Sequence, residues 1–181
     1  MHTFISGGCK NGKSYYAQRV AQAAGRPMYY VATMISTGAE DDARIARHLR
    51  EREGWGFETI ECGRNILSAL EQADCGGAFL LDSVTALLAN EMFAPGGFDA
   101  DAPARVAAEL EEFAGRTRGA VFVSDYLYGD AQIYDEWTEN YRRGLALIDR
   151  RLALCCELSL IHISQSINSR TRASISFGDT P

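Results

Sequence analysis

The sequence has few of the residues that build metal centres and disulfide frameworks. It contains three histidines and five cysteines among 181 residues. The cysteine count is odd, and no C-x-x-C pair or cluster of cysteine and histidine has the spacing of a zinc site. These absences argue against a zinc-binding module and a disulfide-stabilised secreted domain. They are typical of a protein whose thiols stay reduced in the cytosol.

The sequence also lacks an excess of basic charge and long apolar runs. Its net charge is -6 and its pI is about 5.1. Surfaces that bind nucleic acid or anionic membranes need a basic footprint, so we expect neither partner. No apolar run reaches the ~18 residues of a membrane helix, and Met1 leads straight into a short strand pattern instead of a signal peptide. We therefore expect a soluble, cytoplasmic protein without membrane insertion.

What the sequence does contain is a regular alternation of strand and helix patterns over residues 1–157, which we interpret as one domain. Such alternation predicts an α/β fold with a mostly parallel central sheet flanked by helices. Strands are indicated at 2–8, 27–34, 56–62, 78–82 and 119–125, helices at 13–24, 39–54, 65–74, 83–93, 104–117 and 135–156, and a loop at 94–103.

The segment 158–181 differs from the rest of the chain. It is rich in serine and has neither a long helical period nor a clean strand alternation, although "LSLIHI" could begin a final strand. "LSLIHIS" also matches the translation of a transposase end sequence that is used to build sequencing libraries. We hypothesise that the native C-terminus was lost near Glu157 and that the remainder is read-through and disordered; the alternative is a genuine divergent tail.

The stretch "ISGGCKNGKS", residues 5–14, lies between the first predicted strand and the first predicted helix. Gly7, Gly12, Lys13 and Ser14 fit the phosphate-loop spacing G-x-x-x-x-G-K-[ST]. The glycines let backbone N–H groups turn inward, and the following helix adds the positive end of its dipole. Lys13 can reach the terminal phosphates and the Ser14 hydroxyl can hold Mg²⁺. This context predicts a P-loop NTPase-like fold with a nucleotide site.

Two predicted strands end in an acid that could complete such a site, in "FLLDS" at Asp82 and in "VFVSD" at Asp125. A carboxylate at the carboxyl end of a buried strand beside the loop would orient Mg²⁺ or its waters. Asp82 is the first choice because apolar residues precede it. The alternative role for either acid is a helix N-cap, which Ser83 and Thr85 could also supply after Asp82.

His48 stands within "ARIARHLRER", where four arginines flank it. One interpretation is a solvated helix face on which arginine and glutamate pair at i,i+4 spacing. The other is a phosphate site in which His48 acts as nucleophile or proton carrier. A neutral imidazole can attack an α-phosphate and form a phosphoramidate, while the arginines neutralise the phosphates.

The chain resembles the bifunctional adenosylcobinamide kinase/adenosylcobinamide-phosphate guanylyltransferase family of cobalamin biosynthesis. The phosphate loop alone is shared with many families, whereas "YVAT", "ARIxxH" and "LLDSxTxLLAN" are more specific. The matching stretches follow the family's order over about residues 3–157: "ISGGCKNGKS", "YYVATM", "DDARIARHLRER", "FETIEC", "LLDSVTALLANEMF", "VFVSD" and "YRRGLALIDRRLA".

The resemblance implies two reactions and a set of site residues. A nucleoside triphosphate, ATP or GTP, phosphorylates the aminopropanol hydroxyl of adenosylcobinamide. GTP then donates GMP to an enzyme histidine, by motif position His48, from which it passes to adenosylcobinamide phosphate. The resemblance implies Ser14 and Asp82 as Mg²⁺ ligands, Lys13 as a catalytic cation and a homo-oligomer, in the family a trimer. The implied nucleotide contacts are Gly7, Gly8, Cys9, Lys10, Asn11, Gly12, Lys13, Ser14, Ala32, Thr33, Met34, Leu49, Arg50, Glu51, Arg52, Glu61 and Asp82.

The chain departs from the family after the strand that ends in Asp125. Such proteins often carry Asn-Glu-Val-Gly there, whereas this chain has "DYLYGDAQIY" with Tyr126 and Tyr128. The departure concerns the kinase half and the contacts to cobinamide. Two alternatives therefore stay open beside the bifunctional enzyme: a small-molecule P-loop kinase without nucleotidyl transfer, and a nucleotide-binding regulatory protein.

Overall fold

A six-stranded parallel sheet organises the computed structural model, which describes residues 1–8, 11–129 and 131–162. The strand order is β3-β2-β4-β7-β1-β8, and every neighbouring pair is parallel. This confirms the predicted α/β fold with a P-loop NTPase-like arrangement. The strands are β1 (Thr3–Gly7), β2 (Met28–Ala32), β3 (Glu58–Glu61), β4 (Ala78–Asp82), β7 (Gly119–Asp125) and β8 (Leu158–His162).

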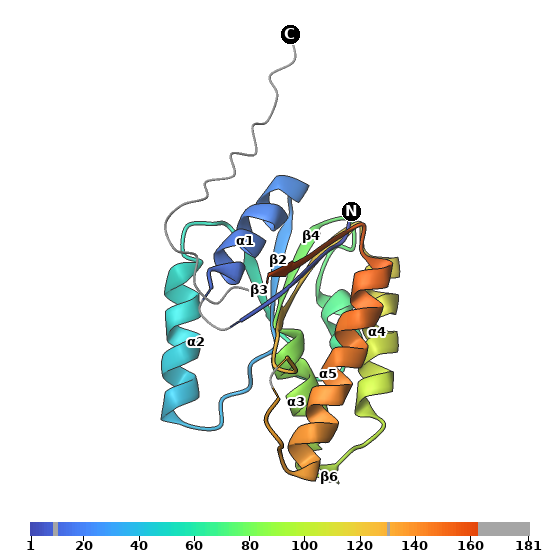
Figure 1. Cartoon of the computed structure of the whole chain (residues 1–181). Coiled ribbons are helices and arrows are strands. Elements are labelled where there is room, and N and C mark those ends of the chain that lie inside the picture. The colour runs from blue at the N-terminus through green and yellow to red at the C-terminus, as the bar shows by residue number, and fades with distance from the viewer. Residues whose placement is uncertain (9–10, 130, 163–181) are drawn as a thin grey trace, which may run out of the picture.

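Helices cover the two faces of the sheet unequally (Figure 1). α1 packs alone against β1, β4 and β7 on one face, while α4 and α5 lie side by side on the other with α3 and the 3-10 helix η1. The helical elements are α1 (Lys13–Ala24), α2 (Ala39–Glu51), η1 (Ile66–Gln72), α3 (Val84–Met92), α4 (Ala102–Arg116) and α5 (Glu136–Cys155).

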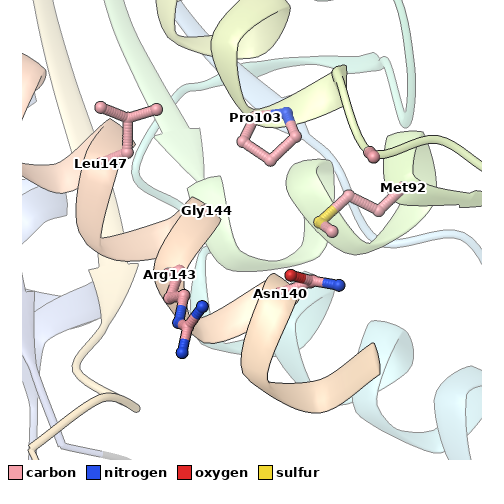
Figure 2. Close-up of a pocket in the computed structure, with 7 residues that line it drawn as sticks. Met92, Pro103, Asn140, Arg143, Gly144 and Leu147 are labelled. Carbon is pink, nitrogen blue, oxygen red and sulfur yellow. The ribbon is translucent and has the colours of Figure 1, made fainter. Parts of the chain in front are cut away.

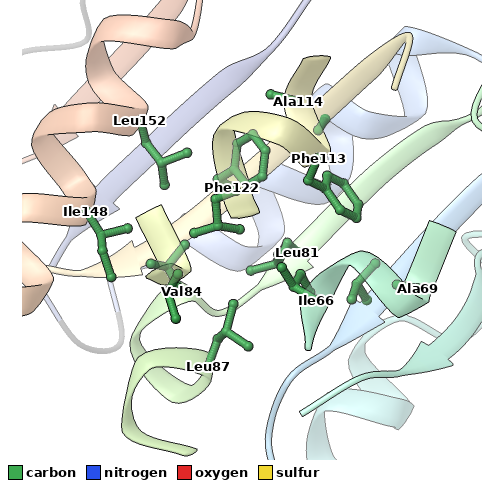
Figure 3. Close-up of a cluster of buried hydrophobic side chains, with 14 of the residues drawn as sticks. Ile66, Ala69, Leu81, Val84, Leu87, Phe113, Ala114, Phe122, Ile148 and Leu152 are labelled. Carbon is green, nitrogen blue, oxygen red and sulfur yellow. The ribbon is translucent and has the colours of Figure 1, made fainter. Parts of the chain in front are cut away.

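Alternation along the strands divides the core into two clusters, because successive side chains point to opposite faces. Ile5, Leu80 and Val123 meet α1 in the smaller cluster. The larger cluster holds aromatic side chains in edge-on contact, with Phe113 of α4 at 5.3 Å from Phe79 and 6.2 Å from Phe122 between ring centroids. Figure 3 shows Phe113 and Phe122 with residues of α3, α5 and η1 that fill the same cluster.

Two predicted elements differ from the structure. The segment 65–74 forms the 3-10 helix η1 instead of an α-helix, starting after Asn65 in the left-handed conformation at φ 48°. The predicted loop 94–103 contributes to a hairpin, β5 (Phe93–Ala94) and β6 (Gly97–Phe98), and to the first turn of α4 from Ala102. Strands of two residues are too short to show alternation, so the sequence carried no signal for this hairpin.

The start of the atypical segment joins the sheet. β8 pairs in parallel with β1, so the final strand that "LSLIHI" suggested is confirmed for residues 158–162. The expectation of disorder or non-native chain from residue 163 onward lies outside the described residues, as do Cys9, Lys10 and Asp130. In the described part of the chain, none of the helices combines the length and apolar character needed to span a bilayer.

Leu152 and Leu154 of α5 provide a matched test of this packing. Leu152 is 1% exposed in the larger cluster, whereas Leu154 is 78% exposed on the same helix. Leu152→Ala removes buried methyl groups and leaves a cavity, so we expect the free energy of unfolding to fall by about 2–5 kcal/mol. Leu154→Ala should change it by no more than about 0.5 kcal/mol. Urea unfolding measures both, and equal losses would contradict the assigned packing of α5.

Candidate active site

The carboxyl ends of three neighbouring strands bring the predicted site residues to one edge of the sheet. Gly7, which begins the phosphate loop, lies opposite Asp125 in the β1–β7 register. Asp82 ends β4 and lies opposite Val123 of β7 on one side and Ala32 of β2 on the other. Because parallel strands end at the same edge, residues far apart in the sequence converge beside the loop.

The described part of the loop leaves an open cradle at the start of α1. Gly12 occupies the position before the helix with φ 84°, a left-handed conformation that glycine adopts without strain. Among the described residues, and apart from chain neighbours, no atom lies within 4 Å of where a Cβ would stand at Gly8 or Gly12. The backbone at these two glycines is thus open to a ligand, and the helix that follows has the N-terminus that an anion-binding loop requires.

Lys13 is held in place by oxygen atoms on both sides of the cradle. Its Nζ lies 2.5 Å from Asp125 Oδ1 and donates a hydrogen bond of 3.1 Å to the Gly8 carbonyl. The side chain is only 11% exposed, so the pair is partly shielded from solvent. Asp125 is thus placed as the partner of the loop lysine. A phosphate that enters the cradle would compete with this carboxylate for the ammonium group.

Asp82 is the electrostatic centre of the candidate site. Tyr30 Oη donates to Asp82 Oδ2 over 3.0 Å, and the Ser14 hydroxyl lies close enough to lower the pKa of this carboxyl group. Loss of solvent raises the pKa of Asp82, and the nearby charge of Asp125 adds to the rise. His48 and the two hydroxyl donors act in the opposite direction, His48 most strongly. The alternative role of Asp82 as a helix cap does not apply, because Ser83 caps α3 by accepting from Ala86 N at 3.2 Å.

Tyr30 and Arg52 form a support behind Asp82 that the sequence analysis missed in part. The Arg52 guanidinium stacks over the Tyr30 ring, with 4.1 Å between Cζ and the ring centroid, and donates to Thr59 Oγ1 over 3.1 Å. Arg52 is 9% exposed, so its charge is not solvated. From the sequence alone, a tyrosine in a β-strand is interpreted as a core residue. Only the position of Tyr30, two residues before the end of β2 at Ala32, could have suggested a polar role.

His48 reaches the site from α2, a helix that has no buried residue. Its side chain is 28% exposed, and Nδ1 lies 3.4 Å from Glu51 Oε2. His48 is close enough to Asp82 to lower the pKa of that carboxyl group. A contact between Tyr15 at the start of α1 and Trp55 beyond the end of α2, 5.6 Å between ring centroids, further joins the two segments.

The other predicted nucleotide contacts fall into two groups. Thr33 is buried, and its Oγ1 donates to the Ser83 carbonyl over 2.8 Å and accepts from the Ser83 N–H over 2.7 Å. Thr33 therefore fixes the ends of β2 and β4 to each other. Asn90 supports this junction by donating to the Thr33 carbonyl over 2.7 Å. The remaining contacts keep accessible surface beside the strand ends or on α2: Ala32, Met34, Leu49, Arg50, Glu51 and Glu61.

The residues present suit Mg²⁺ only together with a nucleotide. Ser14 and Asp82 supply the hydroxyl and carboxylate oxygens that a hard cation prefers. Among the described residues, no group of three or more His, Cys, Asp or Glu side chains could hold a metal ion. Mg²⁺ usually binds through one or two protein oxygens plus phosphate and water, and this pair fits that pattern.

A shallow surface pocket lies away from this edge, between α3, α4 and α5 (Figure 2). Its volume is about 230 Å³, and none of the predicted site residues lines it. Met92, Pro103 and Leu147 give it an apolar wall with Arg143 at its rim. Its lining contains no residue of the phosphate loop and no carboxylate, so the sheet edge remains the candidate active site.

Comparison with known proteins agrees with this geometry. The chain is 34% identical over 91 residues to the bifunctional adenosylcobalamin biosynthesis protein CobP of Pseudomonas aeruginosa. This alignment covers 50% of this chain and 52% of that protein. It is 34% identical over 99 residues to the bifunctional adenosylcobalamin biosynthesis protein CobU of Salmonella typhimurium, covering 54% and 53%. The chain thus matches about half the length of each curated relative.

A family model matches far more of the chain. The model described as CobU, cobinamide kinase / cobinamide phosphate guanyltransferase, aligns with residues 3–165, which include the phosphate loop, His48, Asp82 and Asp125. The resemblance drawn from the sequence motifs is thereby confirmed, and the chain belongs to the cobinamide kinase / cobinamide phosphate guanyltransferase family.

Proposed function

We propose that this protein phosphorylates adenosylcobinamide with a nucleoside triphosphate and then transfers GMP from GTP, through His48, to adenosylcobinamide phosphate. The product is adenosylcobinamide-GDP in cobalamin biosynthesis. The observation that carries the proposal is the position of Asp82, whose carboxylate interacts with both Ser14 of the phosphate loop and His48 of α2. One sheet edge thus holds the elements for both phosphoryl and nucleotidyl transfer.

The kinase step uses the cradle and Lys13. The aminopropanol hydroxyl attacks the γ-phosphorus and its proton passes to solvent, while the bond to the bridging β,γ-oxygen breaks and a nucleoside diphosphate leaves. Lys13 and the N-terminus of α1 lower the energy of the charge that develops on the phosphate oxygens. Ser14 and Asp82 would hold Mg²⁺, which supplies further neutralisation of the phosphates when bound. ATP and GTP are both suitable donors, because these contacts involve only the phosphates.

The guanylyl step uses His48 as the nucleophile. Nδ1 faces Glu51, so Nε2 is the nitrogen left to attack the α-phosphorus of GTP. A P–N bond forms as the bond to the β-phosphate oxygen breaks, and pyrophosphate leaves. An oxygen of adenosylcobinamide phosphate then attacks the same phosphorus and releases the imidazole. Glu51 stabilises the positive charge on the ring while it carries GMP, as a carboxylate beside a catalytic histidine does elsewhere.

The guanine nucleotide subsite would lie between the end of α2 and the ends of β2 and β3. Leu49, Arg50 and Glu61 keep accessible side chains there, while Arg52 is committed to Tyr30 and Thr59. We therefore assign phosphate neutralisation to Lys13 and the exposed arginines of α2, and a supporting role to Arg52. Adenosylcobinamide and its phosphate are the proposed partners. A homo-oligomer, a trimer in analogy to the family, is part of the proposal.

Two other functions remain distinguishable by experiment. A small-molecule kinase without nucleotidyl transfer would need the loop but not His48. A nucleotide-binding regulator would hydrolyse slowly and form no covalent nucleotide adduct. Incubation with GTP labelled at the α-phosphate separates them, because only a nucleotidyl carrier gains label that is acid-labile and base-stable. The proximity of His48 to Asp82 favours the carrier.

His48 separates the two halves of the chemistry. His48→Asn should abolish labelling by α-labelled GTP, because positioning cannot replace the nucleophile of a covalent intermediate. Phosphorylation of adenosylcobinamide should survive in part, since the hydroxyl attacks the γ-phosphate directly. Label incorporation and kinase turnover are measured on the same sample. Undiminished GMP labelling of His48→Asn would remove this residue from the mechanism.

Glu51 tests the orientation of the imidazole. Glu51→Gln should reduce GMP labelling roughly 10-fold or more, because partners that orient a functional histidine commonly contribute 10–100-fold to activity. Glu53→Gln is the matched control, two residues further on, where the described residues show no ion pair for the carboxylate. Equal effects of the two substitutions would show that only the net charge of this segment matters.

Lys13 offers a chemical test that the sequence makes unusually clean, because Lys10 and Lys13 are the only lysines in the chain. Mg-nucleotide should protect Lys13 from acetylation by an amine-reactive reagent, as read by peptide mass spectrometry, since phosphate and ammonium become mutually shielded. Lys13→Met should lower both transfer reactions by about 10²-fold or more while the fold remains intact. Wild-type turnover by the variant, or unchanged acetylation with bound nucleotide, would argue against a phosphate role for Lys13.

A further inference from the structure

A buried carboxylate lies beneath the phosphate loop and has no role in the proposed chemistry. Asp149 is on α5, between core residues Ile148 and Leu152, and is 3% exposed. Figure 3 shows these two neighbours pointing into the larger core cluster. A buried charge costs free energy unless it is fully hydrogen-bonded, so such a residue needs a reason at this position.

Three hydroxyl groups converge on Asp149 from elements that form the active site. Ser6 Oγ of β1 donates to Oδ2 over 3.2 Å, and Tyr128 Oη from the segment after β7 donates to the same oxygen over 2.9 Å. The Ser124 hydroxyl of β7 also stabilises the carboxylate. Asp149 Oδ1 and Ser124 Oγ are both buried, and neither makes a hydrogen bond of good geometry within the described chain.

These contacts connect Asp149 to the strand ends that carry Asp125 and Gly8, the two residues that hold Lys13. Ser6 and Ser124 are direct neighbours in the β1–β7 register, and the next pair in that register is Gly7 with Asp125. Tyr126 N donates to the Gly7 carbonyl over 2.9 Å, which continues the pairing to the start of the Tyr128 segment. A single side chain thus holds both strand ends and the segment that follows β7.

We propose that Asp149 is a positioning residue that fixes the phosphate loop and Asp125 relative to each other, so that Lys13 is presented to the nucleotide. An ionised carboxylate only accepts hydrogen bonds, so it can keep all three hydroxyls pointing at it. When it is protonated it becomes a donor, and one hydroxyl must turn away. This inference rests on the proposed nucleotide chemistry, because the positioning is defined by phosphate binding.

The charge on Asp149 changes within an accessible pH range. Burial raises the pKa of Asp149 to about 6, and the nearby charge of Asp125 adds to the rise, while the Ser124, Tyr128 and Ser6 hydroxyls oppose it. The phenol of Tyr141, on α5 itself, also interacts with Asp149, and the loop cation Lys13 is paired with Asp125.

The raised pKa also fixes the sign of the effect on stability. Between the pKa of this carboxyl group in the unfolded chain and about pH 6, Asp149 is protonated in the folded protein but ionised in the unfolded chain. The ionised residue therefore costs stability above pH 6, and the cost disappears below the unfolded pKa.

The test compares wild type, Asp149→Asn and Tyr128→Phe from pH 5 to 8, measuring Mg-GTP affinity by calorimetry and kinase turnover. Wild-type kcat and affinity should fall as the pH drops through about 6. Asp149→Asn should lose this pH dependence and show roughly 10-fold lower kcat at pH 8, with a Tm equal to or above that of wild type. Tyr128→Phe removes a hydrogen-bond donor to the carboxylate and so raises the pKa of Asp149 further. The kcat and affinity of this variant should therefore fall at a higher pH than those of wild type. Asp101→Asn, an exposed acid at the start of α4, is the control.

The outcomes distinguish failure of the proposed function from failure of the positioning role of Asp149. Wild type that binds no Mg-GTP at pH 8 would overturn the proposed function and the positioning role together. If wild type binds Mg-GTP but Asp149→Asn and Tyr128→Phe both show the wild-type pH profile, the positioning role alone would be overturned. A purely structural residue would lower the Tm of Asp149→Asn at pH 8 without moving the profile. A poorly folded Asp149→Asn leaves the decision to the shifted profile of Tyr128→Phe.

Discussion

The parallel pairing of β1 with β7 is the constraint on which the site depends. It sets Gly7 beside Asp125 and Ser6 beside Ser124, so the loop lysine meets a carboxylate above the pleat and two serines meet Asp149 below it. A shift of one residue in this register would send each side chain to the other face of the sheet. The hydrophobic pattern of β7, with Val123 toward α1 and Phe122 toward α4, excludes such a shift. The geometry that would hold a phosphate thus follows from how the core packs.

Among the described residues, two carboxylates and one lysine lie at this edge of the sheet. Asp125 is paired with Lys13, whereas Asp82 interacts with hydroxyl donors and, at longer range, with a histidine. Negative charge near a phosphate site is tolerable only if a cation accompanies the nucleotide, which explains why Asp82 suits Mg²⁺. The rigid sheet edge and α2 also differ in packing, because α2 contributes no buried residue. His48, the proposed carrier, lies on this helix, so its displacement would cost little in core packing.

Much of this arrangement could be predicted from sequence, and the remainder depends on tertiary contacts. The G-x-x-x-x-G-K-[ST] spacing fixed the loop, and strand ends at Asp82 and Asp125 predicted their convergence because parallel strands share an edge. The sequence could not show that Asp125 would take Lys13 as its partner, since 112 positions separate them and only the strand order decides the matter. Arg52 was expected either on a solvated helix face or at the nucleotide, and the sequence carried no signal for its stacking on Tyr30. The β5–β6 hairpin left no periodic signal, because two residues per strand are too few.

Three buried polar side chains, Ser6, Ser124 and Asp149, lie together below the phosphate loop. The two core clusters of the described chain are otherwise built from apolar side chains. An apolar trio of similar size would avoid the cost of burying a charge, so the acid is hard to explain by stability. The hydrogen bonds that Ser6 and Tyr128 donate to one oxygen of Asp149 only partly offset that cost, but they give the strand ends one defined arrangement. The proposed phosphoryl transfer depends on accurate positioning, so a buried acid that lowers stability can still favour function by fixing the loop.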